Sequence, residues 1–224
     1  MTEAEAPQPG RDCPLCPRLV ALREANRAAF PGWHNAPVSS WGPPDAPLMV
    51  LGMAPGLRGA NRTGRPFTGD HAGKLLYATL LKFGLARGVY EERPDDSLTL
   101  TGCRVTNAVR CVPPANLPQP VEIRTCNRFL QAELAAMPDL KVVLALGVLA
   151  HSALLRARGL PASRHRFAHG AVHALPGGLL LADSYHVSRY NTSTRRLTPE
   201  MFEAVVAEAL RLIAADNRDG GRPA

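Results

Sequence analysis

Four of the five cysteines in this chain fall into two pairs that can share one metal centre. Cys13 and Cys16 form a C-x-x-C near the N-terminus, and Cys111 and Cys126 follow far downstream. Two thiolates at this spacing can coordinate one metal atom, and the downstream pair completes a set of four ligands. Four cysteines suit a zinc ion or a [4Fe–4S] cluster, and their spacing does not choose between the two. Cys103 lies in an apolar run, so we expect it to be a buried strand residue.

A second set of residues suited to chemistry follows short apolar runs. Gly52-Met53-Ala54-Pro55-Gly56 follows the first run, Asn107 lies near the end of the second, and His186 comes just after the last. Glycines beside a proline let backbone amides approach a ligand closely. The loop has neither the Gly-Lys-Ser/Thr of a Walker motif nor a G-x-G-x-x-G, so we expect no nucleotide cofactor.

Apolar runs and helical patterns alternate along the chain. The apolar runs are 48–52, 104–109, 141–146 and 179–183. Helical spacing recurs over about 19–29, 73–83, 121–137, 147–158 and 199–215. Strands that are apolar on both faces are typical of a parallel sheet covered on both sides. We therefore predict an α/β fold, a three-layer α/β/α domain with a central four-stranded parallel sheet, and a ligand beyond the carboxyl ends of its strands.

The composition fits one basic domain. Of 224 residues 46% are hydrophobic, enough for one core, and we predict a single domain over 11–216 with flexible tails at 1–10 and 217–224. The net charge of +7 and the sequence pI near 9.6 favour a polyanion partner, although a GC-rich genome explains the composition equally well. No signal peptide, membrane-spanning run or heptad pattern is visible, so we expect a cytoplasmic monomer with no membrane contact.

The motifs together resemble one enzyme family. Gly52–Gly56, Gly64–Phe67, Thr106–Cys111 and His186–Thr192 look like the motifs of the uracil-DNA glycosylase superfamily, specifically its family 5, and the match runs from Cys13 to about Thr198. The resemblance implies the uracil-DNA glycosylase fold and a [4Fe–4S] cluster on the four paired cysteines. The resemblance to families 4 and 5 also implies that this cluster has a structural role near the DNA surface.

The chemistry of the family assigns roles to individual residues. Cleaving the bond between deoxyribose and a base passes through an oxocarbenium-like sugar and an anionic base. The resemblance implies that Asn107 pairs with the flipped base, that His186 stabilises the departing base, and that Phe67 stacks on it. Gly52, Met53 and Ala54 would form the rest of the base-binding site.

The group that positions water is the least determined. Family 4 carries a glutamate in the first motif, where this chain has Met53. An apolar first motif is the mark of family 5 and shifts attention to Asp70, which we expect to be catalytic. Aspartate at the start of a helix is also commonly an N-cap, and the neighbouring His71 could tune or replace it.

Several residues of the loops are expected to engage DNA. Extruding a base leaves a gap that a wedge can fill, and Tyr190 stands where relatives carry an intercalating leucine, flanked by Arg189 and Asn191. We expect Tyr190 or Arg189 to probe the minor groove. Ser188 and the backbone of Pro55 and Gly56 would bind phosphates. The basic run 164–166 with His169 either faces the DNA backbone or is only a solvated surface.

The sequence thus predicts a monofunctional DNA repair glycosylase. It would flip uracil, and also deaminated purines such as hypoxanthine, out of DNA near the nucleoid and leave an abasic site without a lyase step. Two alternatives remain open. One is a family 4 type enzyme restricted to uracil, and the other is an iron–sulfur DNA-binding module that no longer catalyses.

Overall fold

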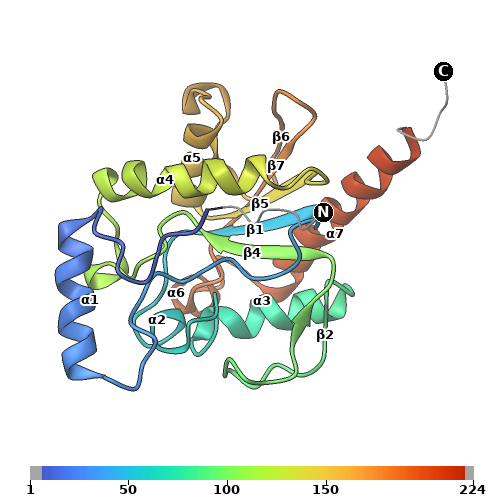
Figure 1. Cartoon of the computed structure of the whole chain (residues 1–224). Helices are drawn as coiled ribbons and strands as arrows, with labels where there is room; N and C mark the ends of the chain where they lie inside the picture. The colour runs from blue at the N-terminus through green and yellow to red at the C-terminus, as the bar shows by residue number, and fades with distance from the viewer. Residues whose placement is uncertain (1–6, 220–224) are drawn as a thin grey trace, which may run out of the picture.

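A five-stranded sheet forms the centre of the computed structural model, which describes residues 7–219 (Figure 1). Its strand order is β4-β1-β5-β7-β6. The bounds are β1 Leu48–Gly52, β4 Cys103–Asn107, β5 Val142–Leu146, β6 Val172–Ala174 and β7 Leu180–Ser184. The four predicted strands are confirmed and run parallel, but the prediction of four was one strand short. Strand β6 pairs antiparallel with β7 at the edge, and its three residues carry too little apolar pattern to be read from the sequence.

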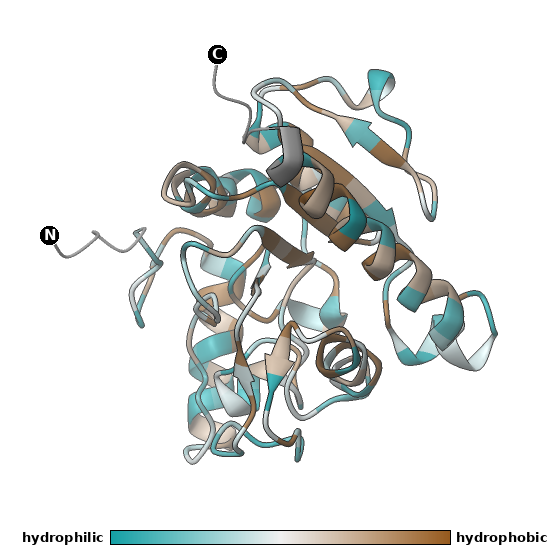
Figure 2. Cartoon of the chain, turned by 90° about the vertical axis from the view of Figure 1, so that its right-hand side faces the viewer, coloured by the Kyte–Doolittle hydropathy of each residue, from teal (hydrophilic) through white to brown (hydrophobic). Residues whose placement is uncertain are grey.

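Helices cover both faces of the sheet, which confirms the predicted three layers. Helices α3 (His71–Lys82) and α7 (Pro199–Asp219) pack on one face, and α4 (Pro120–Ala135) and α5 (Val148–Ala157) pack on the other. Alternate residues of a strand point to opposite faces, so Val50 joins the first core and Leu51 the second. Figure 1 shows α4 and α5 above the sheet and α3 below it, and Figure 2 shows the strands as a hydrophobic band between the helices.

The remaining elements are short connections around the sandwich, together with helix α1 (Pro17–Ala29). The short elements are α2 (Ala60–Thr63), α6 (Arg189–Ser193), the short 3₁₀ turns Pro114–Asn116 and Ala162–Arg164, and the hairpin strands β2 (Ala86–Arg87) and β3 (Thr99–Leu100). Within the described residues, Gln8 accepts a hydrogen bond from Arg110. Of the predicted tails at 1–10 and 217–224, residues 1–6 and 220–224 lie outside the described residues. No helix in the described part of the chain is both long and apolar enough to cross a bilayer.

A buried ion-pair network anchors β4, the strand that carries Asn107. The carboxylate of Glu133 on α4 is 1% exposed and accepts from the guanidinium groups of Arg104, at 2.6 Å, and Arg110. The hydroxyl of Thr106 donates to the same carboxylate at 3.2 Å. The two arginines hold the pKa of Glu133 below its usual range against the effect of burial, so the network is charged. It fixes β4 against α4 on either side of Thr106.

Candidate functional site

A pocket of about 610 Å³ opens at the carboxyl ends of the parallel strands, where this class of fold binds its ligands. Segments that follow β1, β4, β5 and β7 all reach it. The predicted site residues that line it are Met53, Ala54, Pro55, Gly56, Phe67, Asp70, Asn107, His186, Ser188, Arg189 and Asn191. Of the residues predicted to bind the base or the DNA, Gly52 and Tyr190 do not line it.

Asn107 presents an unpaired amide to the pocket. Its side chain is 3% exposed, and within the described part of the chain its Oδ1 has no hydrogen-bond partner. Gly52 is its neighbour across the β1–β4 ladder, and a Cβ on residue 52 would overlap the Asn107 amide and stand 2.5 Å from the Phe67 ring. Gly52 therefore makes room for the amide. A buried polar atom without a partner is costly, so this one is suited to a ligand that donates to it.

Hydrogen bonds to its backbone carbonyls hold the loop that carries Phe67 in place. Phe67 has a φ of +51°, a conformation that an aromatic residue rarely adopts. The hydroxyl of Tyr90 donates to its carbonyl at 3.1 Å, and the hydroxyl of Tyr77 donates to the carbonyl of Pro66. Two residues earlier, the Arg65 guanidinium makes a two-point ion pair with Asp96 at 2.7 and 2.8 Å. These contacts fix the Phe67 ring as one wall of the pocket.

His186 reaches the pocket as a neutral imidazole. Burial lowers its pKa to about 4, because removing water disfavours the charged ring. Its ring centre lies 6.2 Å from that of Phe67. The side-chain amide of Asn191 donates to the His186 carbonyl at 2.8 Å, which fixes the backbone from which the imidazole projects. Asn191 thus lines the pocket and also positions His186.

Asp70 serves two structural purposes at once. Its carboxylate accepts a hydrogen bond from the backbone N–H of Ala72 at 3.1 Å, so Asp70 is the N-cap of α3. A helix cap was one of the two roles that the sequence allowed for it. The same carboxylate lines the pocket and packs against Gly56 and Gly59, where a Cβ on residue 56 would stand 2.8 Å from its Oδ2. Burial raises its pKa above the ordinary value. Next to it, His71 Nε2 and Thr192 Oγ1 lie 2.8 Å apart, so that ring is held on α6.

The predicted DNA-contacting residues gather at the pocket mouth. Tyr190 is 70% exposed on α6, outside the pocket, while Arg189 beside it lines the pocket. The Ser188 hydroxyl caps α6 by accepting from the backbone N–H of Asn191 at 3.4 Å. In the predicted basic run, His165 and His169 turn inward, and His169 stacks on the ring of Tyr185 with centres 4.9 Å apart. That run is therefore not a continuous basic surface.

Other parts of the pocket wall were not predicted. Gly147 directly follows β5 with a φ of +92°, and its place after a strand was a signal that the sequence offered. Phe167, Tyr185 and Arg196 form a further wall, in which the Arg196 guanidinium lies 4.6 Å from the centre of the Tyr185 ring. Asn116 comes from a loop, and nothing local in the sequence marks it.

The four paired cysteines come together between α1, α4 and the loop after β4. Cys13, Cys16, Cys111 and Cys126 line one small cavity with apolar neighbours such as Leu19 and Val109. The backbone N–H of Arg110 donates to Cys126 Sγ at 3.4 Å. Among the described residues, no three of these sulfur atoms lie mutually within 4.8 Å, whereas the sulfurs around one zinc ion lie about 3.8 Å apart, from Zn–S bonds of about 2.3 Å. Cys103 is fully buried in β4, as predicted.

Comparison with known proteins agrees with this geometry. A family model described as "Uracil DNA glycosylase superfamily" matches residues 39–210. A protein of Thermus thermophilus named "Type-5 uracil-DNA glycosylase" is 50% identical over 205 residues, which cover 89% of this chain and 93% of the relative. Proteins of the same name from Mycobacterium tuberculosis and Pyrobaculum aerophilum are 42% and 39% identical over 209 residues, covering 89% and 92% of this chain and 78% and 89% of the relatives. The chain therefore belongs to the uracil-DNA glycosylase superfamily and, within it, to the type-5 uracil-DNA glycosylases.

Proposed function

We propose that this protein is a DNA repair glycosylase that flips a deaminated base out of DNA and hydrolyses its N-glycosidic bond, leaving an abasic site. The observation that carries the proposal is the unpaired, buried amide of Asn107 in a pocket that also holds Phe67 and His186. A flipped uracil offers a ring N–H next to a carbonyl, and an asparagine amide can pair with both. The Phe67 ring stacks on the base.

His186 stabilises the departing base. The leaving uracil carries negative charge on an oxygen next to the broken bond, and a hydrogen-bond donor aimed at that oxygen lowers the barrier. An imidazole with a pKa of about 4 is neutral at pH 7, and one of its ring nitrogens carries a proton. That N–H can donate a hydrogen bond to the oxygen without transferring its proton. A fixed neutral donor needs no protonation step before the base leaves.

Asp70 acts on the sugar side of the bond. The deoxyribose becomes positively charged as the base leaves, and a buried carboxylate stabilises that charge and positions the attacking water. Its packing against Gly56 and Gly59 holds the carboxylate at the pocket wall. Met53 lies in the first motif and lines the pocket with an apolar side chain, so Asp70 is the acidic group that serves this role.

Tyr190 and its neighbours hold the distorted DNA. A side chain that is 70% exposed beside the pocket can enter the stack where the base has left. Arg189 adds charge at the same place, while the Ser188 hydroxyl and the backbone of Pro55 and Gly56 bind phosphates. The protein acts as a monomer on DNA in the cytoplasm.

The four clustered cysteines hold a [4Fe–4S] cluster. Four thiolates in an apolar cavity, with a backbone N–H directed at one sulfur, are the donor set that such clusters take. When bound, the cluster links α1 to α4 and to the loop after β4, and it takes no part in the reaction.

We also propose a broad substrate range and a single reaction step. A pocket of about 610 Å³ with an apolar first motif can admit hypoxanthine as well as uracil. Among the described residues, no lysine lines the pocket. A lyase step needs an amine to form a Schiff base with the sugar, so we expect the reaction to stop at the abasic site.

An alkaline strand-cleavage assay tests this proposal. Duplexes with one uracil or one hypoxanthine are incubated with the wild type and with His186→Ala, then divided into alkali-treated and untreated samples. We expect strand breaks for both bases only after alkali, and rates about 10²–10³-fold lower for His186→Ala. Breaks from uracil alone would indicate a uracil-restricted enzyme. A brown protein that binds the duplexes and cleaves neither base would indicate a DNA-binding module.

A further inference from the structure

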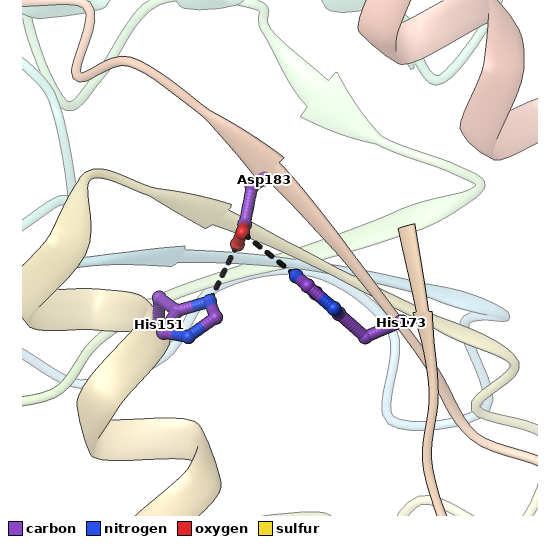
Figure 3. A group of neighbouring side chains, drawn as sticks. All are labelled: His151, His173 and Asp183. Carbon is purple, nitrogen blue, oxygen red and sulfur yellow. Dashed lines mark hydrogen bonds and ion pairs between the residues drawn. The ribbon is translucent and has the colours of Figure 1, made fainter. Parts of the chain in front are cut away.

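A buried cluster of two histidines and one aspartate lies outside the base pocket. His151 comes from α5, His173 from β6 and Asp183 from β7, and none of the three lines the pocket (Figure 3). His151 Nδ1 lies 2.8 Å from Asp183 Oδ1, and His173 Nε2 lies 3.2 Å from Asp183 Oδ2. Within the described part of the chain, the ligand atoms of these three residues all lie within 4.8 Å of one another.

The hydrogen bonding of His151 leaves two acceptors facing each other. Its Nε2 lies 2.8 Å from the carbonyl oxygen of His165, and a carbonyl only accepts, so Nε2 carries the ring proton. In a neutral imidazole the other nitrogen, Nδ1, then has a lone pair and no proton. That lone pair points at the carboxylate of Asp183, which is 0% exposed and also only accepts when ionised. Either a proton on Nδ1 or a metal ion bound to both atoms removes this repulsion.

The donor set is one that transition metals take. We propose that His151, His173 and Asp183 bind one divalent transition-metal ion, with Zn²⁺ as the probe that identifies the site. Two imidazoles and a carboxylate are common ligands of zinc, and three protein ligands leave a fourth position for water. His173 is 15% exposed, which gives an ion a way in from the sheet edge.

The surroundings match those of a metal site. Metal-binding histidines commonly donate their second N–H to a backbone carbonyl, which fixes the ring, as the His165 carbonyl does for His151. The rings of Phe167 and His151 pack edge to face, with centres 5.6 Å apart. A bound ion would therefore tie α5, β6 and β7 together and brace the segment that brings Phe167 to the pocket wall. Its role would be structural, and the proposal does not depend on the glycosylase activity.

The competing cation is a proton. A charged His151 would donate one N–H to Asp183 and the other to the His165 carbonyl, which satisfies the same groups without a metal. The two cases differ in whether the protein holds zinc, and that can be measured directly. Because the four cysteines can also take zinc, the experiment has to separate the two sites.

Zinc and iron content are measured in the same samples of the full-length protein. The wild type, His151→Gln, His173→Gln and the control His34→Gln are equilibrated with Zn²⁺, passed over a desalting column and analysed by mass spectrometry of the elements. His34 is a suitable control because its Nε2 lies 3.1 Å from the carbonyl of Pro37, away from the cluster. Crystals of the zinc-treated wild type are measured at the zinc absorption edge to locate the ion, so the test holds even if a variant does not fold.

We expect about one zinc per chain in the wild type and in His34→Gln, and less than about one tenth of that in His151→Gln and His173→Gln, with iron unchanged. The anomalous peak should lie between the three side chains. A wild type that retains no zinc would overturn the proposal in favour of the proton. A peak at the cysteines alone, or equal zinc in all four proteins, would overturn it as well.

Discussion

Gly52 and Asn107 stand opposite each other at the carboxyl ends of β1 and β4, and the missing side chain of Gly52 leaves the space that the Asn107 amide occupies. A Cβ at residue 52 would overlap that amide and press on the Phe67 ring. One glycine thus allows both the Asn107 amide and the Phe67 ring to reach the pocket.

Replacing Gly52 with alanine should therefore impair excision more than folding. The added methyl group displaces Asn107 or Phe67, and overpacking of this kind costs about 1–3 kcal/mol of stability. We expect the Gly52→Ala protein to fold and to lose most of its uracil excision, measured as kcat/KM on a uracil duplex. Gly32→Ala is the matched control, because no atom lies within 4 Å of its added Cβ. Wild-type activity in Gly52→Ala would mean that the amide does not need its present position.

Acid should destabilise the protein through His186. Its pKa is about 4 when folded and near 6.5 when unfolded. As the pH falls from 6.5 towards 4, the unfolded state therefore binds a proton that the folded state does not, and stability is lost over that window. Chemical unfolding at several pH values should show a steeper loss for the wild type than for His186→Gln, whose side chain does not titrate. Parallel curves for the two proteins would contradict the burial of a neutral imidazole.

Removing Glu133 should strongly destabilise the fold. The Glu133→Ala change leaves Arg104 and Arg110 buried without their shared carboxylate, and breaking a buried pair in this way costs about 3–5 kcal/mol. The free energy of unfolding in urea measures the effect. Glu208→Ala is the control, since its ion pair with Arg211 is exposed and should contribute little. Similar losses in both variants would mean that burial does not strengthen the network.

The sequence predicted the parts of this molecule that depend on local pattern. Strands such as 48–52 and 142–146 are wholly apolar, and the rule that ligands bind beyond their carboxyl ends brought Asn107 and His186 to one pocket. The four cysteines likewise meet at one cavity. The roles of Asp70 in catalysis and of Tyr190 in DNA binding stay predictions.

The sequence did not predict features that depend on distant partners. The Arg65–Asp96 ion pair joins residues 31 positions apart, and no local signal marks either one. Between 165 and 169, inward-facing residues alternate with exposed ones, and His165, Phe167 and His169 form the inner side. That period of two was visible in the sequence, but the arginines beside it made the segment look like a basic surface. Asp183 likewise lies in a run that the sequence predicts as an apolar strand. The sequence does not show that His151 and His173 contact it, because these contacts form only in the folded chain.

The most direct test of the proposed reaction separates the two roles of Asp70. In Asp70→Asn the amide still caps α3, while the carboxyl group whose pKa burial raises is replaced by a neutral group, so stability should equal or exceed that of the wild type. Asp70→Ala, which also loses the cap, should be less stable by about 1 kcal/mol.

Single-turnover excision of uracil from a duplex is measured for Asp70→Asn beside the wild type, with binding to the same duplex as the control. The account predicts that excision falls by about 10²–10⁴-fold while binding stays within a few-fold. Excision at the wild-type rate by Asp70→Asn would contradict it and would leave Asp70 as a helix cap alone.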